Sequence, residues 1–298
     1  MERHIPVLLE RVIEVLRPER GEVFIDLTAG FGGHSARLLA QVGSSGFGYL
    51  VDQDSVAIEA LRQRFADHDN VAIKQANFAE LAELELPSAD MILLDIGVSS
   101  VQLDDAQRGF SFMQDGPLDM RMDQTQGDTA ADLVNSLGER ELADIIYHYG
   151  EERKSRQIAK AIVEARKVRT IVSTLQLADL VERAIGRRGK IHPATRTFQA
   201  LRIAVNQELR ALEEVLPAAI RQLKPGGRLA VITFHSLEDR IVKRYFKRLV
   251  TPEKDAMGRE VSIPECVLVT KKPMSGLDEK DFNPRARSAK LRAVEKTK

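Results

Sequence analysis

A short apolar run followed by three glycines places the strongest constraint on the fold of this chain. Four of the five residues from 23 to 27 are apolar, which is typical of a buried strand. Gly30, Gly32 and Gly33 permit a tight turn with positive φ and no Cβ in the way of a ligand. Apolar residues then recur with helical spacing up to Gly43, which is placed to end a helix. A strand, a glycine turn and a helix in this order predict a nucleotide-sized site.

The residues around the glycine turn narrow the choice of nucleotide. A second predicted strand ends in Asp52, 20 residues after Gly32, and a carboxylate at that distance can accept hydrogen bonds from both hydroxyls of a ribose. Ser35 stands where a dinucleotide-binding turn has its third glycine, His34 before it is bulky, and Asp26 adds negative charge. These features disfavour a pyrophosphate and favour an adenosine ligand with a cationic tail, which is S-adenosylmethionine. The alternative is an ordinary strand–helix turn that binds no ligand.

Length and composition predict a protein with a sizeable core. The chain has 298 residues, of which 43% are hydrophobic and 30% charged, and that balance is typical of soluble proteins of one large or two ordinary domains. No stretch approaches the ~18 apolar residues of a membrane span, and charged residues interrupt the start, so we expect no signal peptide. The single cysteine, Cys266, excludes an internal disulfide framework and a multi-cysteine zinc site. We therefore predict a cytoplasmic protein with no membrane partner and no metal site.

The zero net charge hides an asymmetry along the chain. Residues 1–150 hold 11 Lys and Arg against 26 Asp and Glu, whereas residues 151–298 hold 33 against 18. A surface divided in this way can steer a polyanion toward one side of the molecule. The alternative is that these charges only solvate helix faces.

Strands and helices alternate in the first third of the chain, which predicts a parallel sheet. A fourth predicted strand again ends in an acid, Asp95. Phe78 follows the third strand at the same sheet edge, where its ring can cover an adenine or simply join the core. From residue 97 to 127 no period is sustained. A loop of this length is usually functional or disordered, and its phenylalanines and methionines argue against disorder.

A run of helices follows the long loop. We predict helices at 131–136, 139–149, 153–166 and 174–185, and a last helix that starts at 195 and carries apolar residues on one face as far as Leu216. Strand patterns then resume at 228–233, 266–270 and 290–294 and complete a seven-stranded sheet. We interpret the chain as an α/β domain in two parts, residues 1–126 and 215–298, interrupted by a helical domain at 127–214.

Several long and rare sequence strings resemble those of one family, the bacterial ribosomal RNA small-subunit methyltransferase H family, also called MraW. The resemblance runs from one end of the chain to the other and is far more specific than the glycine turn. It is carried by residues 95–100, 102–105, 108–113, 115–122, 192–200, 234–240 and 283–288.

The resemblance implies a Rossmann-like class I methyltransferase domain interrupted by an inserted all-helical domain. It also implies S-adenosylmethionine-dependent methylation of the exocyclic N4 of one cytidine in small-subunit (16S) ribosomal RNA, near the decoding centre. Whether the partner is free RNA or the assembled small ribosomal subunit stays open, as does the oligomeric state. Carried over by position, the cofactor contacts are Gly32, Gly33, His34, Asp52, Phe78, Asp95 and Gln102.

Asp95 and Ser99 are the predicted catalytic residues. They follow the fourth strand, where amino-group methyltransferases commonly place an (Asp/Asn/Ser)-Pro-Pro-aromatic turn, although this chain lacks those prolines and that aromatic residue. We hypothesise that Asp95 accepts a hydrogen bond from the cytosine amine; the alternative is that it only orients the methionine amine of the cofactor. Methylation at C5 is disfavoured because it requires a cysteine nucleophile, and Cys266 lies far along the chain from the glycine turn.

Phe112, Arg196 and His235 are the predicted contacts to the substrate. An aromatic ring such as that of Phe112 can stack on a base, whereas a His or Arg near a helix start is alternatively a cap or half of a surface ion pair. Two other functions stay open. One is a small-molecule methyltransferase, which has no need of a large insertion with 13 Lys and Arg against 5 Asp and Glu between residues 151 and 202. The other is a ribosome-assembly factor that binds the cofactor without catalysis.

Overall fold

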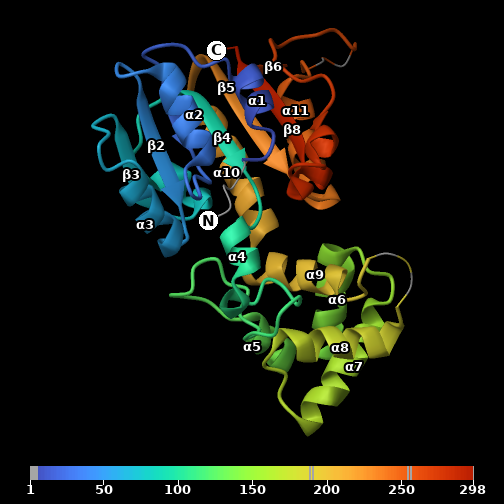
Figure 1. Ribbon diagram of the computed structural model, residues 1–298. Coiled ribbons are helices and arrows are strands. Elements are labelled where there is room, and N and C mark those ends of the chain that lie inside the picture. The colour runs from blue at the N-terminus through green and yellow to red at the C-terminus, as the bar shows by residue number, and fades with distance from the viewer. Residues whose placement is uncertain (1–5, 188, 190, 254, 256, 298) are drawn as a thin grey trace. The chain divides into compact units, whose positions relative to one another are not determined.

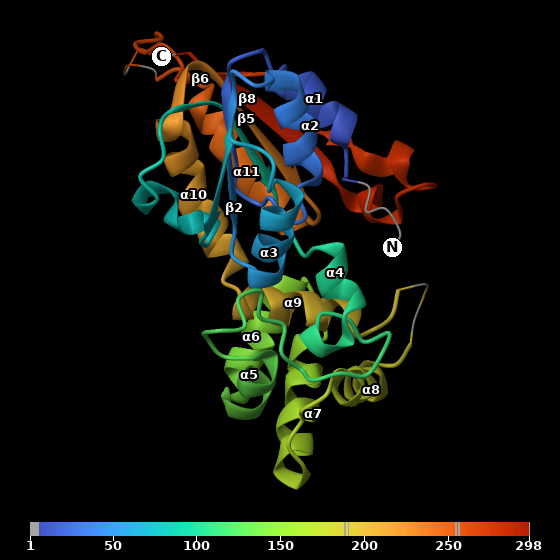
Figure 2. The same cartoon turned by 60° about the vertical axis from the view of Figure 1, so that its left-hand side comes forward.

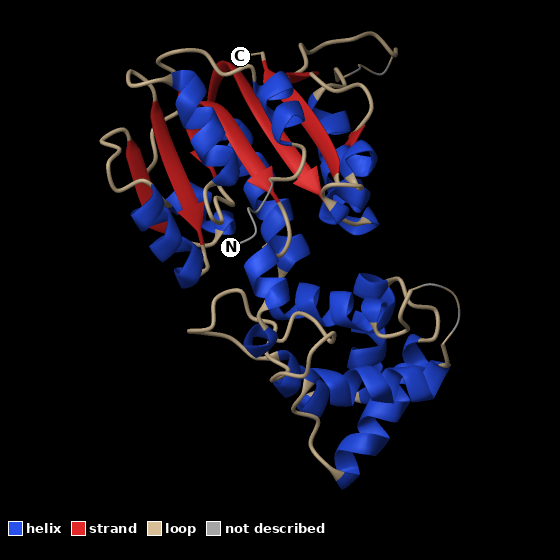
Figure 3. Ribbon diagram, viewed as in Figure 1, coloured by secondary structure: helices blue, strands red, loops and turns tan. Residues whose placement is uncertain are grey.

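A sheet of eight strands carries the first of two compact units (Figures 1 and 3). The computed structural model describes residues 6–187, 189, 191–253, 255 and 257–297. The first unit comprises the described residues up to Gly97 and from Leu209 onward, and the second comprises Val98–Glu208. The strands are β1 (Val23–Asp26), β2 (Phe47–Asp52), β3 (Val71–Gln75), β4 (Ala89–Asp95), β5 (Leu223–Thr233), β6 (Cys266–Leu268), β7 (Met274–Ser275) and β8 (Lys290–Lys296).

The strand order is β3-β2-β1-β4-β5-β8-β6, and the two-residue β7 pairs with β8 beside this path. Strands β1 to β5 pair in parallel, whereas β8 runs antiparallel to β5, β6 and β7. The prediction of a seven-stranded, mainly parallel sheet is confirmed, with β7 as an addition. Because neighbouring strands β2, β1, β4 and β5 are parallel, their carboxyl ends meet at one edge of the sheet, where open α/β sheets bind ligands.

Helices cover both faces of this sheet, as the view in Figure 2 shows for α2 and α10. One face packs against α1 (Leu9–Leu16), α2 (Gly33–Val42) and α3 (Ser55–Arg64), and the other against α10 (Glu208–Gln222) and α11 (Ser236–Leu249). Successive strand residues alternate between the two cores: Phe24 joins the first and Ile25 the second. Three 3₁₀ helices complete the unit, η1 (Phe78–Glu83), η3 (Gly276–Glu279) and η4 (Pro284–Ser288).

The second unit is helical, and no strand element occurs among its described residues (Figure 3). Its core is formed mainly by the apolar faces of the helices together with residues of the long loop before them. The elements are α4 (Ser100–Asp104), η2 (Ala106–Arg108), α5 (Ala130–Ser136), α6 (Glu139–Gly150), α7 (Ser155–Val168), α8 (Thr174–Ile185) and α9 (Thr195–Val205).

The long loop is an ordered part of this helical unit. Phe110, Leu118, Met120 and Met122 are buried in its core, which is why the loop is rich in large apolar residues. Arg108 is also buried and donates hydrogen bonds to the carbonyl oxygens of residues 121 and 122, at 3.2 and 2.9 Å.

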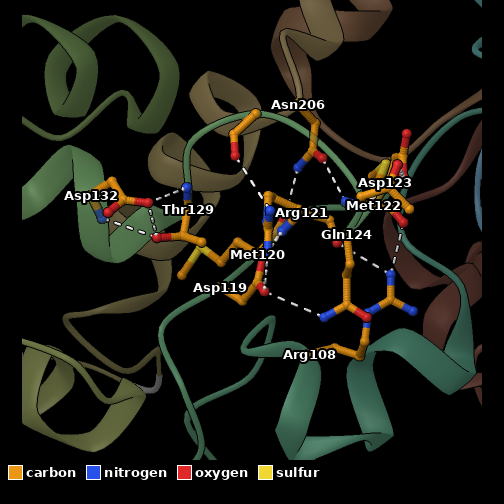
Figure 4. Close-up of polar contacts among 12 residues, drawn as sticks. Arg108, Asp119, Met120, Arg121, Met122, Asp123, Gln124, Thr129, Asp132 and Asn206 are labelled. Carbon is orange, nitrogen blue, oxygen red and sulfur yellow. Dashed lines mark hydrogen bonds and ion pairs between the residues drawn. The ribbon is translucent and has the colours of Figure 1, made fainter.

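Asn206 ties the loop to the end of α9 (Figure 4). Its side chain accepts a hydrogen bond from the Met122 N–H at 2.8 Å and donates to the carbonyl oxygens of Met120 and Arg202 at 2.8 and 2.9 Å. At the same place Gln207 has a φ of 49°. The predicted single helix from 195 to Leu216 is therefore wrong: the chain forms α9, breaks at residues 206 and 207, and starts again as α10.

The compact units divide at residues 97/98 and 208/209, whereas the sequence placed the domain boundaries at 126/127 and 214/215. The first difference arises because the loop residues belong to the helical core, and the second because α10 continues to Gln222 and packs on the sheet. Each compact unit has equal numbers of basic and acidic residues, 28 of each in the first and 16 of each in the second. The charge asymmetry along the chain therefore does not distinguish the two units. No described helix has the length and apolar character needed to cross a membrane.

Candidate functional site

The glycine turn lies between the carboxyl end of β1 and the start of α2, as its sequence predicts. Gly32 is the N-cap residue of α2 and has a φ of 74°, and a Cβ there would lie 2.7 Å from Phe65 Cε2. A Cβ at Gly33 would lie 2.4 Å from Pro6 Cγ. Both glycines are thus required by the packing around the turn, and Gly32 also by its positive φ.

Asp52 at the end of β2 is bonded to the glycine turn. Its Oδ2 accepts a hydrogen bond from the Gly30 N–H at 2.8 Å, and its Oδ1 accepts one from the Asp54 N–H at 2.9 Å. Burial raises the pKa of Asp52 to about 6, although these backbone hydrogen bonds act to lower it. The side chain is held in a fixed orientation and keeps acceptor capacity, since each carboxylate oxygen has a second lone pair.

Asp26 at the end of β1 is fully enclosed, with 1% of its surface exposed. Its Oδ2 accepts a 2.6 Å hydrogen bond from the Ser35 hydroxyl, which is the structural role of the residue that replaces the third glycine. Burial raises the pKa of Asp26 to about 6, opposed by the hydrogen bonds from Ser35 and Thr28 and reinforced by the neighbouring charge of Asp52. The carboxyl group therefore titrates close to neutral pH.

Asp95 at the end of β4 faces His34 from the first turn of α2. His34 Nε2 lies 2.9 Å from the carbonyl oxygen of Val7, and His34 Nδ1 lies 3.7 Å from Asp95 Oδ2. The backbone N–H of Asp95 donates a 2.6 Å hydrogen bond to the Thr28 hydroxyl. These contacts bring two of the predicted cofactor residues together at the sheet edge and join them to the segment before α1.

The second oxygen of the Asp95 carboxyl group, Oδ1, is shielded from solvent and has no hydrogen-bond partner among the described residues. Burial raises the pKa of Asp95 well above its usual range, and the nearby charges of Asp26 and Glu238 raise it further. A buried acceptor without a donor is costly. A raised carboxyl pKa in combination with such an orphaned atom is typical of a functional site.

The end of β5 adds a fourth acid to this region. His235 is the N-cap residue of α11, and Glu238 Oε2 accepts hydrogen bonds from the N–H groups of Phe234 and His235 at 2.7 and 3.2 Å. The two side chains also lie close together, with His235 Nε2 2.9 Å from Glu238 Oε1, a contact that is an ion pair only when the imidazole is protonated. His235 and Glu238 form the capping box of this helix.

Phe78 lies just beyond β3, where Asn77 caps the 3₁₀ helix η1 by accepting a 2.9 Å hydrogen bond from the Ala79 N–H. Asn77 also donates to the Gln53 side chain next to Asp52, at 2.9 Å. The Phe78 ring is half-buried and packs on the α10 side of the sheet. Its predicted contact with an adenine stays a prediction.

The remaining predicted residues lie in the second unit and hold local structure there. Ser99 and Gln102 form the capping box of α4. The Phe112 ring packs against those of His192 and Phe198, with ring centroids 4.7 Å apart in each case. Arg196 lies near two acidic residues: its guanidinium donates to the carbonyl oxygen of residue 151 at 3.3 Å and lies 3.6 Å from the Glu152 carboxylate. These contacts do not show what any of the four residues binds. The predicted roles of Ser99, Gln102, Phe112 and Arg196 therefore stay predictions.

Two contributors to the sheet edge were missed by the sequence reasoning. The Thr28 hydroxyl accepts a hydrogen bond from the backbone N–H of Asp95, and Glu238, which belongs to α11, raises the pKa of Asp95. The only sequence signal for Glu238 is its capping-box spacing from His235. Thr28 gives no such signal, because its contact depends on the pairing of β1 with β4.

Comparisons with known proteins agree with the resemblance of the motifs. The model of the MraW methylase family matches residues 1–297. A relative named ribosomal RNA small subunit methyltransferase H, from Coprothermobacter proteolyticus, is 49% identical over 298 residues, covering 98% of this chain and 96% of its own. A relative of the same name from Deinococcus radiodurans is 51% identical over 300 residues, covering 98% of this chain and 89% of its own. A solved structure of an rRNA methylase from Streptococcus thermophilus, which matches 99% of this chain and 100% of its own, is 10% identical with a TM-score of 0.46. The family match over nearly the whole chain confirms the resemblance predicted from the motifs: this chain belongs to the MraW methylase family.

Proposed function

We propose that this chain uses S-adenosylmethionine to methylate the exocyclic N4 of a cytidine in small-subunit ribosomal RNA, near the decoding centre. The observation that carries the proposal is the carboxyl edge of the sheet, where Asp26, Asp52 and Asp95 surround the glycine turn with raised pKa values. Family membership supports methyl transfer, and the names of the relatives support the ribosomal RNA substrate.

The residues at this edge fit S-adenosylmethionine by their charge. No Lys or Arg of the described residues forms an ion pair with any of the three acids, so a cationic ligand stabilises them as carboxylates. Asp52 is placed to accept hydrogen bonds from the ribose, and the orphaned Oδ1 of Asp95 is an acceptor for an ammonium group or an amine. When bound, S-adenosylmethionine supplies a methyl group that is activated by the positive charge on its sulfur.

Asp95 is also suited to assist the attacking amine. The N4 amine of cytosine is a poor nucleophile because its lone pair is delocalised into the ring. A carboxylate that accepts an N4–H hydrogen bond favours localisation of that pair and stabilises the positive charge that develops on nitrogen. Burial and the nearby charges of Asp26 and Glu238 raise the pKa of Asp95 above its usual range, which makes its carboxylate a stronger proton acceptor than an exposed one.

Methylation at C5 is further disfavoured by the environment of Cys266. C5 chemistry needs a thiolate nucleophile, but burial raises the pKa of this thiol to about 11. Cys266 also belongs to β6, which β8 and β5 separate from β4 in the sheet. The thiol is therefore protonated at neutral pH and lies away from the strand ends that carry the acids.

The test is methyl transfer from isotope-labelled S-adenosylmethionine to free 16S rRNA and to small ribosomal subunits, followed by digestion to nucleosides. We expect label in N4-methylcytidine, and the more strongly labelled substrate identifies the partner. Label in another nucleoside contradicts the N4 assignment. Transfer to a small molecule but to neither RNA substrate favours a small-molecule methyltransferase, and cofactor binding without transfer to any substrate favours the non-catalytic assembly factor.

Asp95→Asn tests the role of the carboxylate separately from the fold. We expect turnover to fall by about 10²-fold or more, the range for loss of a positioned acid–base group, while Asp67→Asn, an exposed aspartate remote from the strand ends, retains parent activity. Full turnover of Asp95→Asn with unchanged affinity for S-adenosylmethionine would limit Asp95 to a structural role.

A further inference from the structure

The outer face of α11 carries five cationic side chains that the site at the sheet edge does not use. They are all exposed and follow one another at helical spacing, so that they form a single stripe, which consists of Arg240, Lys243, Arg244, Lys247 and Arg248. The opposite face of the same helix is buried in the core of the first unit through Val242, Phe246 and Leu249. Helix α11 is therefore amphipathic, with its apolar side fully occupied.

Four of the five cations of the stripe lack acidic partners among the residues that the structure describes. Within the described ranges, no carboxylate forms an ion pair with Lys243, Arg244, Lys247 or Arg248, and the Arg248 guanidinium lies over the Tyr245 ring at 4.9 Å. The cations of the adjacent strand behave differently, since Lys290 and Arg292 of β8 both pair with Asp239 of α11, at 3.1 and 2.7 Å. Asp239 is thus engaged toward the sheet and does not compensate the charges of Lys243, Arg244, Lys247 and Arg248.

This arrangement costs helix stability in the free protein. Like charges four residues apart on a helix repel each other, and the stripe contains three such pairs, 240/244, 243/247 and 244/248. An anionic partner along the helix reverses that repulsion. The cations lie on successive turns over about 12 Å of helix axis, a spacing that suits a polymer with repeated negative charges better than a single anion.

The position of the stripe connects it to the sheet edge of the same unit. Helix α11 begins directly after β5, whose neighbour β4 ends in Asp95. Arg240 is in the first turns of the helix, and the other cations extend from there toward its carboxyl end. A strand of nucleic acid bound along the stripe therefore leads toward the edge that holds the acids.

We propose that the α11 stripe binds the phosphodiester backbone of the RNA substrate. The inference rests on the proposed function, because it assigns the part of that substrate which this surface contacts. An anionic membrane is a poorer fit: peripheral helices bind membranes by inserting their apolar face, and the apolar face of α11 is packed in the core. Contacts to phosphates fix the position of the protein on the RNA but do not recognise the base sequence.

The test compares two variants that lose the same charge. In the stripe variant, Lys243→Gln, Arg244→Gln and Lys247→Gln are combined. In the control variant, Arg20→Gln, Arg62→Gln and Arg221→Gln remove three exposed cations that are scattered over the same unit. Binding of a fluorescently labelled single-stranded RNA of mixed sequence is measured over about 0.05–0.3 M KCl, since phosphate contacts are recognised by their salt dependence. Affinity for S-adenosylmethionine reports that the fold is retained.

We expect the slope of log K against log salt to become shallower by about 2 in the stripe variant, from about 0.7 per lost phosphate contact, and affinity at 0.15 M salt to fall about 50-fold. The control variant should bind like the parent. For methyl transfer, the stripe variant should show a higher KM for ribosomal RNA with kcat retained at saturating RNA.

If both variants lose the same affinity for RNA, the loss is an effect of net charge and the proposal is overturned. Parent-like RNA binding by the stripe variant would also overturn it. Loss of binding to phosphatidylglycerol vesicles with RNA binding unchanged would assign the stripe to a membrane instead. The RNA-binding measurement needs neither cofactor nor turnover. A parent protein that binds RNA through the stripe but transfers no methyl group to it would therefore contradict the proposed function and not the stripe.

Discussion

Replacing Asp26 by Asn should change how the stability of the α/β unit depends on pH. The Asp26 carboxyl is almost completely enclosed, and burial raises its pKa from 3.8 to about 6. The folded state therefore holds this proton more strongly than the unfolded state does. Between about pH 4 and pH 6 the folded state binds more protons, so the free energy of unfolding falls as pH rises through this window.

The size of the effect follows from the two pKa values. With 3.8 in the unfolded state and about 6 in the folded state, the buried carboxylate costs about 3 kcal/mol at pH 8 and about half of that at pH 5. Asp26 alone thus lowers the free energy of unfolding by about 1–2 kcal/mol between pH 5 and pH 8. Removing its charge also lowers the pKa of Asp95, because Asp26 is one cause of the raised value, and this adds to the difference in the same direction.

Asp26→Asn removes the free-energy cost of the buried carboxylate with little change in the shape of the side chain. The amide oxygen can still accept from the Thr28 N–H, and the Ser35 hydroxyl can reverse and accept from the amide NH₂. We therefore expect the variant to be more stable than the parent at pH 8, and its advantage to shrink by about 1–2 kcal/mol at pH 5.

The assay is urea unfolding at both pH values, followed by a probe in the sheet. The chain contains no tryptophan, so Phe47→Trp in β2 gives a fluorescence signal for the α/β unit alone. Asp67→Asn in the same background is the control, because that side chain is exposed. If Asp26→Asn and its background lose equal free energy of unfolding between pH 5 and pH 8, the reasoning about a buried, proton-retaining carboxyl is refuted.

Two further predictions address the ligand and the loop. Affinity for S-adenosylmethionine should fall as pH drops from 7.5 to 5, because a cation binds the ionised forms of Asp26 and Asp52, whose pKa values are about 6. Calorimetry at pH 6 in buffers of different ionisation enthalpy should therefore show that binding releases protons. Binding without proton release would contradict the role assigned to these two charges. Asn206→Ala should destabilise the second unit by about 1–3 kcal/mol, since it leaves the Met122 N–H without its acceptor. The amide hydrogens of Met120 and Met122 should then exchange faster with solvent. Unchanged protection of these amides would show that the loop is held by its apolar residues alone.

The sheet and its edge were predictable because their signals are local. A strand that ends in an acid, a glycine turn and a 20-residue spacing to a second acid are all visible in the sequence, and Asp26, Asp52 and Asp95 lie at strand ends as expected. What these acids contact was not predictable. His34 Nε2 meets the carbonyl oxygen of Val7, 27 residues away in the chain, and no periodicity encodes that pairing.

The break between α9 and α10 was also not predictable from local sequence. Apolar residues keep a helical period from Phe198 to Leu216, so the pattern predicts one helix. The interruption at Asn206 is decided by hydrogen bonds to residues more than 80 positions earlier. Local pattern fixed which residues are buried on each side of the break, whereas tertiary contacts fixed where the helix stops.

Charge pairing separates the functional edge of the sheet from the opposite one. At the amino ends of the strands, Glu22 pairs with Arg228 at 2.7 Å and Asp90 pairs with Lys224 at 2.8 Å. At the carboxyl ends, the partners of Asp26, Asp52 and Asp95 within the described part of the chain are N–H and O–H groups and a histidine at 3.7 Å.

The same strands therefore carry paired acids at one end and acids without a Lys or Arg ion pair at the other. Lys and Arg side chains pair with the acids at the amino ends of the strands, so the same fold could also place them at the carboxyl ends. A requirement for stability alone therefore does not account for the missing ion pairs at the carboxyl ends. The missing positive charge is accounted for if a ligand supplies it, and a sulfonium with an adjacent ammonium group has the charge that this edge lacks.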